Sequence, residues 1–376
     1  MSARRERLRI AMFAHNYLPH PGGLEVMVWN LARGLAERHD VVLVTSAFDG
    51  ASGVSREDGM EVHRLPTLHV AERMGVPYPI PLGGGVRAAM HATSSADVVH
   101  AHGALYLQTV LARRVARRAG ARFVLTEHVG FVEYPQRLFD VAQRVAWGCI
   151  GDSMLRRADA VVTYNARVHR WLSERGRRVV DFIGNGVDFA RFRPRGRDER
   201  RALRRSFDLP EEGVVALFVG RDAGKKNLDT LLRARRAGYT LAVCGAQRNL
   251  SGGGADLIDL GVVAYDRMAD LFASVDLMVH PASGEGFPLA VQESVASGVP
   301  VVLLWDEGYG RWMPRDLVVA CDALDEIEPA LAGLAADATR RVRLAAEGRD
   351  WAEQHWSWAA SVAAYEQIYD EAGNHA

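Results

Sequence analysis

The strongest chemical signal in this sequence is a pair of adjacent lysines, Lys225 and Lys226, the only lysines among its 46 basic residues. They stand in the loop RDAGKKN, which begins at Arg221 and follows the apolar run VVALFVG. A guanidinium and an ammonium at the carboxyl end of a strand can hold a diphosphate from two directions. The loop lacks the Gly-x-x-x-x-Gly-Lys-Ser/Thr pattern of a P-loop. We therefore predict a diphosphate site of another kind, with an exposed turn of solvated charges as the alternative.

Two glutamates, Glu285 and Glu293, are eight residues apart in the segment SGEGFPLAVQES. The first falls in a loop shaped by Gly284, Gly286 and Pro288, and the second falls about one turn into the following helix. A carboxylate on that helix suits two adjacent ribose hydroxyls, because it can accept a hydrogen bond from each. Loop N–H groups suit phosphate or sugar oxygens. A capping glutamate and a surface glutamate are the alternative.

A Gly-Gly pair, Gly22 and Gly23, ends the loop HNYLPHPGGLE and precedes a helix predicted to start near Glu25. Glycines there let backbone N–H groups approach an anion at the positive end of a helix. A plain turn is the alternative reading of this weak signal. No segment supplies the Gly-x-Gly-x-x-Gly of a dinucleotide fold, which disfavours a nicotinamide or flavin dehydrogenase.

Short apolar runs alternate with helical patterns along the whole chain, which predicts βαβ units and parallel sheets covered on both faces. The pattern restarts after the arginine-rich connector RFRPRGRDERRALRR, so we predict two doubly wound domains, 1–190 and 191–350. Residues 351–376 form a predicted packing helix that returns to the N-terminal domain. The loops at the carboxyl ends of the strands then predict a ligand site in a cleft that the two domains face. The predicted strands of the second domain are VVALFVG, YTLAVCG, GVVAY, DLMVHP and PVVLL.

Composition places the chain among ordinary globular proteins, with 48% hydrophobic residues in 376. Its three cysteines, Cys149, Cys244 and Cys321, are far apart, which excludes a disulfide scaffold or a Cys-type zinc site and favours a reducing compartment. The apolar run after the N-terminal arginines is too short for a signal peptide, and no stretch approaches the roughly 18 apolar residues that cross a bilayer. We expect a cytoplasmic protein that binds no nucleic acid.

Net charge is zero, yet residues 1–205 hold 32 basic and 20 acidic residues, and residues 206–376 hold 14 and 26. A basic half suits anionic partners, while two surfaces attracting each other are the alternative. Arginines concentrate on one predicted helix and just after it, at 113, 114, 117, 118 and 122. We include peripheral association with an anionic membrane, at its inner face, among the expected interactions, and a solvated helix face is the alternative.

Taken together, these motifs resemble the retaining nucleotide-sugar glycosyltransferases of the GT-B fold, specifically the large family with the Glu-x7-Glu signature, family 4. The resemblance covers nearly the whole chain. The segments that carry it are PGGLE, DVVHAHG, TEH, ADAVVTYNA, IGNGVDFARFRP, VGR with KKNL, ASVDLMVHPASGEGFPLAVQESVASGVPVV and the WSW tail.

The resemblance implies roles for particular residues of the donor site. Gly23 would offer its N–H to the donor phosphate, Arg221 and Lys226 would hold the diphosphate, and Glu293 would bind the ribose. The transferred sugar would contact Glu285 and the backbone of Phe287, Pro288 and Leu289.

On the N-terminal side, the resemblance implies that His128 contacts the donor sugar near its reacting carbon. Gly22 and His102 are expected on the acceptor side, and His100 is a further candidate there. A lone histidine is more often structural, so only the motif context supports these roles. His128, Glu285, Arg221 and Lys226 form the expected catalytic set.

The activity implied is transfer of a hexose-type sugar, with retention, from a UDP- or GDP-linked donor to a hydroxyl of a lipid, glycan or small molecule. No Asp-x-Asp occurs, and we expect neither a metal nor a cofactor. Charge that develops on the departing diphosphate would be stabilised by pre-placed cations, and its oxygen can accept the acceptor's proton. A nucleotide-sugar binding protein without transferase activity, a GT-B sugar-nucleotide epimerase, and hydrolysis by a Glu285–Glu293 pair remain the alternatives.

Overall fold

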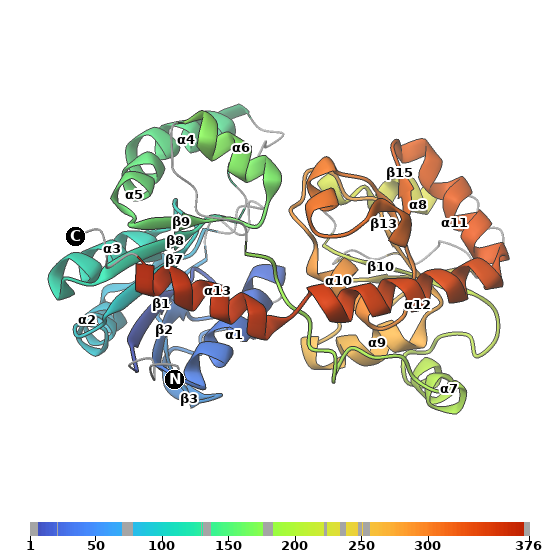
Figure 1. Cartoon of the computed structure of the whole chain (residues 1–376), viewed down its shortest axis with the longest axis horizontal. Coiled ribbons are helices and arrows are strands. Elements are labelled where there is room, and N and C mark those ends of the chain that lie inside the picture. The colour runs from blue at the N-terminus through green and yellow to red at the C-terminus, as the bar shows by residue number, and fades with distance from the viewer. Residues whose placement is uncertain are drawn as a thin grey trace. The chain divides into compact units, whose positions relative to one another are not determined.

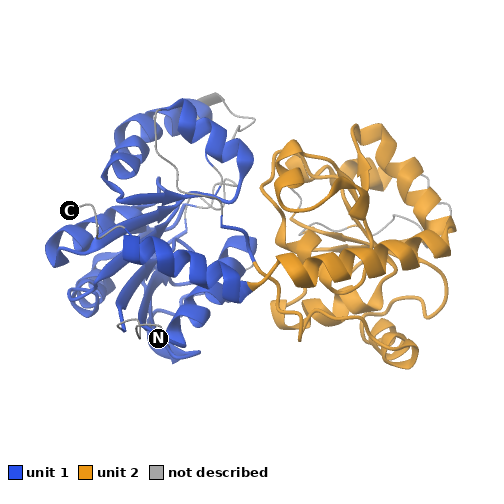
Figure 2. Cartoon of the chain, in the orientation of Figure 1, with its two compact units in different colours: residues 1–185, 358–376 blue, residues 186–357 orange. Residues whose placement is uncertain are grey.

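The computed structural model describes residues 7–20, 22–69, 78–128, 130, 137–175, 183–221, 224–233, 238–246, 250 and 256–371. They form two compact units, drawn in different colours in Figure 2. Unit 1 contains Met1–Asn185 and Trp358–Ala376, and unit 2 contains Gly186–Ser357. The predicted limits at 190 and 350 therefore lie a few residues from the divisions observed.

Unit 1 is built on a seven-stranded sheet of order β3-β4-β2-β1-β7-β8-β9, parallel except at its edge strand β3. Its central strands are short, mostly apolar and buried, as expected for strands covered on both faces. The strands are β1 (Arg9–Phe13), β2 (Asp40–Ser46), β3 (Gly53–Glu57), β4 (Met60–Leu65), β7 (Val98–His102), β8 (Arg122–Thr126) and β9 (Ala160–Val162), with a separate pair β5 (Thr67–Leu68) and β6 (Ile80–Pro81).

Helices flank this sheet on both sides (Figure 1). They are α1 (Gly23–Ala36), α2 (Gly83–Ala92), α3 (Leu107–Ala119), α4 (Arg137–Ala146), a π-helical turn η2 (Trp147–Gly151), α5 (Asp152–Arg157), α6 (Ala166–Glu174) and α13 (Trp358–Glu371). The strands β1, β7 and β8 each end in a loop that leads to a helix, so the polar residues of these loops gather at one edge of the sheet.

Unit 2 has a six-stranded parallel sheet of order β12-β11-β10-β13-β14-β15. The strands are β10 (Val215–Val219), β11 (Thr240–Cys244), β12 (Leu257–Asp259), β13 (Leu277–His280), β14 (Val301–Leu304) and β15 (Val319–Cys321). The helices are α7 (Arg197–Ser206), α8 (Leu228–Arg233), α9 (Met268–Ser274), α10 (Leu289–Ala296), α11 (Ile327–Ala336) and α12 (Ala338–His355). The shorter 3-10 turns are η3 (Gly224–Lys226), η4 (Tyr265–Arg267), η5 (Glu307–Arg311), η6 (Arg315–Leu317) and η7 (Leu324–Glu326).

The predicted α/β class with two Rossmann-like sheets is confirmed, whereas one predicted strand is wrong. The run GVVAY, residues 261–265, lies outside the sheet, and the strand beside β11 is β12. β12 is only three residues long, with the sequence LID. A segment this short shows no hydrophobic periodicity from which a strand could be predicted. Tyr265, assigned to the strand, instead begins η4.

The C-terminal segment is also not one helix. α12 ends at His355 within unit 2, and α13 begins at Trp358 within unit 1 (Figure 1). Trp356, only 3% exposed, anchors the junction by donating from its indole Nε1 to the carbonyl of Trp312, at 3.0 Å. α13 packs against α1. The return of the tail to the N-terminal unit therefore begins at residue 358 rather than at 351.

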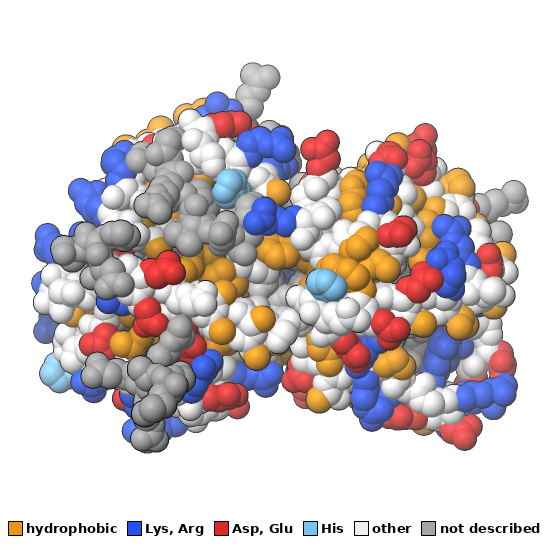
Figure 3. Space-filling view, in the orientation of Figure 1, with side chains coloured by type: hydrophobic (Ala, Val, Ile, Leu, Met, Phe, Trp, Pro, Cys, Tyr) orange, Lys and Arg blue, Asp and Glu red, His pale blue; other side chains and the backbone are white. Residues whose placement is uncertain are grey.

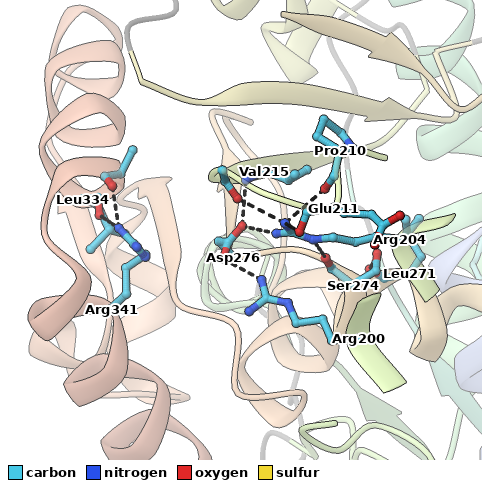
Figure 4. Close-up of polar contacts among 12 residues, drawn as sticks. Arg200, Arg204, Pro210, Glu211, Val215, Leu271, Ser274, Asp276, Leu334 and Arg341 are labelled. Atoms are coloured by element: carbon cyan, nitrogen blue, oxygen red, sulfur yellow. Dashed lines mark hydrogen bonds and ion pairs between the residues drawn. The ribbon is translucent and has the colours of Figure 1, made fainter. Parts of the chain in front are cut away.

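The arginine-rich connector fastens α7 onto unit 2. Asp276 accepts hydrogen bonds from Arg200 at 2.6 Å, from the N–H of Val215 at 2.7 Å, and from Arg204 (Figure 4). Arg204, which is 4% exposed, also donates to the carbonyl oxygens of Ser274, Pro210, Glu211 and Gly213, at 2.9–3.1 Å. These two arginines therefore bind partners within unit 2 and stabilise its fold.

This placement corrects the charge asymmetry counted along the chain. The connector lies in unit 2, and the acidic C-terminal tail lies in unit 1. Unit 1 then holds 24 basic and 20 acidic residues, and unit 2 holds 22 and 26, so the units carry +4 and −4 rather than +12 and −12. On the face drawn in Figure 3, basic and acidic side chains are interspersed. The expected strongly basic half is therefore not a property of either unit.

Candidate active site

The polar residues singled out in unit 2 gather at the carboxyl ends of β10 and β13. The two strands are hydrogen-bonded neighbours, so the loops that follow them are adjacent. The N–H of Ser283 donates to the carbonyl of Lys225 at 2.9 Å. The amide of Asn227, a residue with a left-handed φ of 51°, donates to the carbonyl of Pro281 at 2.8 Å. These two bonds fix the lysine loop against the glutamate loop.

Lys226 and Glu285 meet where the loops touch. The Lys226 Nζ lies 2.8 Å from Glu285 Oε2, and the Lys225 Nζ lies 3.6 Å from the other carboxylate oxygen. His280, the last residue of β13, places its Nε2 3.2 Å from Glu285 Oε2. The structure thus brings together two residues that are 59 positions apart in the sequence.

The electrostatics of this cluster favour a charged glutamate. Burial alone would raise the pKa of Glu285, but the His280 and lysine contacts outweigh it and hold that pKa well below its usual range. Burial lowers the pKa of His280, so the imidazole is neutral at pH 7. The Lys226 side chain is 18% exposed, so one cation of the cluster can be reached from solvent.

Arg221 stands at the other end of the same loop, directly after Gly220, and is exposed. A side chain at Gly220 would approach the methylene groups of Lys226 to 3.3 Å, which is tighter than most packed contacts. Glycine at this position therefore leaves room for the lysine to lie along the end of β10. Both cations predicted for a diphosphate are within one short loop.

Glu293 lies in the second turn of α10 and is 5% exposed. Its Oε1 accepts a hydrogen bond from the hydroxyl of Tyr265 at 2.9 Å. Burial raises the pKa of Glu293 to about 7, against the opposing effects of Tyr265 and the nearby Arg191. Arg191 lies over the Tyr265 ring, 4.4 Å from its centroid, and donates to the Tyr265 carbonyl. The carboxyl is thus held in place by Tyr265, and its burial favours the protonated form more than in an exposed glutamate.

The segment from Phe287 to Leu289 connects Glu285 to α10. Phe287 is 5% exposed and packs edge-on against Tyr309 and tilted against Trp356, with ring centroids 5.8 and 5.3 Å apart. Pro288 precedes the first residue of α10, Leu289. The packing of the Phe287 ring against two other aromatic rings therefore fixes the backbone segment that was predicted to contact a sugar.

In unit 1, Gly22 precedes α1 and Gly23 begins it, and both are exposed. A Cβ at Gly22 would lie 2.2 Å from a carboxylate oxygen of Glu25, so only glycine allows Glu25 to fold back over the helix start. His20 Nδ1 lies 2.6 Å from Glu25 Oε1. The nearest acidic side chain at this helix start is therefore engaged with His20.

The histidines of unit 1 are buried at the ends of β7 and β8. His102 Nδ1 lies 3.0 Å from His128 Nε2, and His128 Nδ1 lies 3.4 Å from the Tyr164 hydroxyl. Burial lowers the pKa of His128 to about 3 and that of His102 well below its usual range. Both rings are therefore neutral, and at this pair one nitrogen must donate to the other.

His100 is not a candidate for acceptor contact. Its Nδ1 lies 2.8 Å from the hydroxyl of Tyr369, and its Nε2 lies 2.8 Å from the hydroxyl of Thr126. Thr126 in turn lies 3.1 Å from the hydroxyl of Tyr365. Because both nitrogens are bonded to fully buried partners, His100 ties β7 to α13. His102 is equally buried but keeps its Nε2 without a hydrogen-bond partner among the described residues.

Two residues that sequence reasoning missed are His280 and Tyr265. His280 ends a strand just as His128 follows one, so the same strand-end argument would have found it. Tyr265 was missed because GVVAY was predicted to be a strand, which gave no reason to expect a contact between the Tyr265 hydroxyl and Glu293. Among the described residues, no group of three or more His, Cys, Asp or Glu side chains is arranged to hold a metal ion.

Solved structures of the GT-B fold, which are built on two Rossmann-like sheets, match this chain. A sucrose-phosphate synthase from Thermosynechococcus elongatus matches with a TM-score of 0.77 over 97% of this chain and 99% of its own, at 18% identity. Anabaena Alr3699/HepE in complex with UDP-glucose matches with a TM-score of 0.74 over 97% and 100%, at 16% identity. At these identities the likeness establishes the fold.

Sequence comparison supplies the family. Residues 21–191 match the model of Glycosyltransferase Family 4, and residues 199–313 match that of glycosyl transferases group 1. A GDP-mannose-dependent alpha-mannosyltransferase from Mycolicibacterium smegmatis is 30% identical, over 84% of this chain and 83% of the relative. A D-inositol 3-phosphate glycosyltransferase from Salinispora tropica is 29% identical, over 93% and 81%.

The chain belongs to Glycosyltransferase Family 4 and has the GT-B fold. It is a retaining glycosyltransferase that depends on a nucleotide sugar. In the parts of the chain that the structure describes, no helix is both long and apolar enough to cross a membrane.

Proposed function

We propose that the chain transfers a hexose-type sugar from a UDP- or GDP-linked donor to an acceptor hydroxyl, with the donor held by unit 2. The observation that carries this is the meeting of Lys226 with Glu285 beside α10, whose second turn holds Glu293. A cation for the diphosphate, a carboxylate for the sugar and a carboxylate for the ribose then follow one another along a single edge of the sheet.

The diphosphate is proposed to bind Arg221 and Lys226, with the N–H of Gly23 as a further donor. Without a ligand, Lys226 is paired with Glu285, so an arriving diphosphate shares a cation that is already positioned. As the glycosidic C–O bond breaks, negative charge grows on the departing diphosphate, and these cations stabilise it more than they stabilise the bound donor. A phosphate oxygen of the departing group accepts the proton of the attacking hydroxyl.

The ribose is proposed to bind Glu293. One oxygen of this carboxylate already accepts from Tyr265, which leaves the second oxygen and the remaining lone pairs for the two ribose hydroxyls. Glu285, with the backbone from Phe287 to Leu289, is proposed to contact the transferred sugar. His128 and His102 are buried and neutral, so in unit 1 we propose that they orient neutral hydroxyl groups and carry no charge to the reaction.

The relatives guide the choice of donor and acceptor for a first experiment. A GDP-mannose-dependent mannosyltransferase is among them, and so is a D-inositol 3-phosphate glycosyltransferase. We propose GDP-mannose as the first donor to assay, beside UDP-linked hexoses. The acceptor is proposed to be a lipid, a glycan or a small polyol.

The test is release of nucleoside diphosphate from GDP-mannose and UDP-glucose, each with and without candidate acceptors, with the product's anomeric configuration read by NMR. Acceptor-dependent release with retention supports the proposal. Binding of the donors with no release under any acceptor would favour a nucleotide-sugar binding role, and conversion of the donor without an acceptor would favour an epimerase.

A further inference from the structure

The buried hydroxyl of Tyr309, near the proposed sugar site, makes no hydrogen bond with the described residues. Tyr309 lies in η5, the turn that follows β14, and is 1% exposed. The backbone around it is fully engaged, because its carbonyl accepts from the N–H groups of Trp312 and Met313, at 2.8 and 3.0 Å.

Leaving a buried hydroxyl unpaired costs free energy, whereas phenylalanine would fill the same space without that cost. The ring itself is well packed, edge-on against both Phe287 and Trp305 with centroids 5.8 Å from each. Packing therefore explains the aromatic ring at this position and leaves the hydroxyl unexplained.

The Tyr309 ring packs against a residue of the proposed donor site. Phe287, which the ring touches, lies two residues after Glu285. Burial, followed by the negative charges of Glu285 and Asp306, raises the pKa of Tyr309, so the hydroxyl stays protonated and both carboxylates lie within electrostatic reach. Asp306 accepts from the N–H of Gly308 at 2.8 Å and is thus partly occupied.

We propose that the Tyr309 hydroxyl hydrogen-bonds a hydroxyl group of the transferred sugar and so helps to select that sugar. The inference rests on the proposed function, because it needs a nucleotide sugar whose sugar lies beside Glu285 and Phe287. A sugar hydroxyl both donates and accepts, so it can pair with the phenolic group in either sense. The Tyr309 hydroxyl is not proposed to contact the nucleotide part of the donor.

The experiment compares Tyr309→Phe with the wild type in binding of four ligands: GDP, GDP-mannose, UDP and UDP-glucose. Calorimetry gives the affinity ratio between each nucleotide sugar and its nucleoside diphosphate. We expect the variant to lose about 5- to 30-fold in affinity for the nucleotide sugar that the wild type accepts and to keep its affinity for the corresponding diphosphate. The melting temperature of the ligand-free variant is expected to equal or exceed that of the wild type.

Tyr239→Phe is the matched control, since Tyr239 is 5% exposed in a separate hydrophobic cluster of unit 2 that includes β10 and β11 side chains. It should leave the affinity ratio unchanged. An unchanged ratio in Tyr309→Phe, or equal losses for the diphosphate and the nucleotide sugar, would overturn the inference and leave the proposed function standing. Failure of the wild type to bind any of the four ligands would instead overturn the proposed function, and the inference with it.

Discussion

The carboxyl edges of the two sheets have opposite electrical character. At the edge of unit 1, His102 and His128 are buried, neutral and bonded to each other. At the edge of unit 2, Glu285 is held ionised and pairs with Lys226, and both side chains are partly exposed to solvent. Both sheets are doubly wound and present their loops in the same way, so the fold decides where polar side chains gather, and the loop residues decide their charge. The predictions below test that contrast.

Removing the cation from the ionic edge should have the largest effect. We expect Lys226→Ala to lower kcat/KM by about 30- to 1000-fold, which is about 2–4 kcal/mol in the transfer barrier, because the diphosphate loses a charge-assisted contact that tightens as the bond breaks. Steady-state kinetics with the accepted donor measures this effect. Arg221→Ala is expected to fall in the same range.

Lys225→Ala is the matched control for Lys226→Ala. Lys225 is 47% exposed and lies farther from Glu285, at 3.6 Å, so the variant should lose less than about tenfold. Wild-type rates in Lys226→Ala and Arg221→Ala would contradict the proposed diphosphate site.

Glu293→Gln should weaken donor binding and stabilise the empty protein. The pKa of Glu293 is raised to about 7, against a usual value of 4.5, so the folded protein binds more protons than the unfolded chain between these values. Its free energy of unfolding therefore falls as pH rises from 4.5 to 7, by at most about 3 kcal/mol. We expect the variant's melting temperature to exceed that of the wild type at pH 8 and to match it near pH 4.5.

Donor affinity supplies the second half of this test. A nucleotide with an intact ribose should bind Glu293→Gln more weakly by about 1–2 kcal/mol, since an amide accepts fewer hydrogen bonds from paired hydroxyls. A 2′,3′-dideoxyribose analogue should bind the variant and the wild type equally. An equal penalty on that analogue would show that Glu293 supports the loop and does not bind the ribose.

Acid should weaken unit 1 through its neutral histidines. Burial lowers the pKa values of His15, His100 and His128 to about 3, against 6.5 in an unfolded chain. The unfolded state then binds more protons below pH 6.5, so stability is lost as pH falls from 6.5 toward 3.

Hydrogen exchange, corrected for its intrinsic pH dependence, can locate this loss. Between pH 7.5 and 5.5, peptides from β7 and β8 should lose more protection than peptides from β11 and β14, which carry no histidine. Equal losses in these two sets of peptides would contradict the neutral edge described here.

The smallest effect is expected from the arginines of α3. Arg114, Arg117 and Arg118 are exposed, but Arg113 is half-buried with its guanidinium 5.9 Å from the Phe123 ring centroid, so it does not belong to the predicted stripe. We expect binding to vesicles of anionic lipid at low salt, weakened by at most about 1 kcal/mol in Arg117→Gln. Equal co-sedimentation with neutral and anionic vesicles would contradict peripheral membrane association.

The sequence predicted the two sheet edges because each strand is an apolar run that ends at glycine or polar residues, and such residues mark loops. The loops holding Lys226 and Glu285 each follow an uninterrupted apolar run, and glycines mark both. The resemblance to a known family then supplied roles that residue chemistry left open. Contacts such as Tyr265 with Glu293, 28 residues apart, depend on a short 3-10 turn whose existence no periodicity reveals.

Burial was the other quantity that the sequence left undetermined. Helical spacing placed Arg113 with Arg117, but the packing of α3 on β8 turned Arg113 toward Phe123. His100 and His102 looked equivalent in the pattern HAH. Of these two histidines, only His100 hydrogen-bonds a tyrosine of α13. The tyrosines of α13 lie 265 or more residues after His100 in the chain, so local sequence patterns could not show which histidine they contact.

The return of α13 to unit 1 also constrains how the chain is made. Tyr365 and Tyr369 are 1% and 0% exposed, and Tyr369 binds His100 across 269 positions. Since α13 follows the whole of unit 2 in the sequence, β7 and β8 leave the ribosome long before α13 is translated, and unit 1 completes its core only after unit 2 has been synthesised. A nascent chain that still lacks α13 therefore leaves the surface that α13 covers in unit 1 exposed.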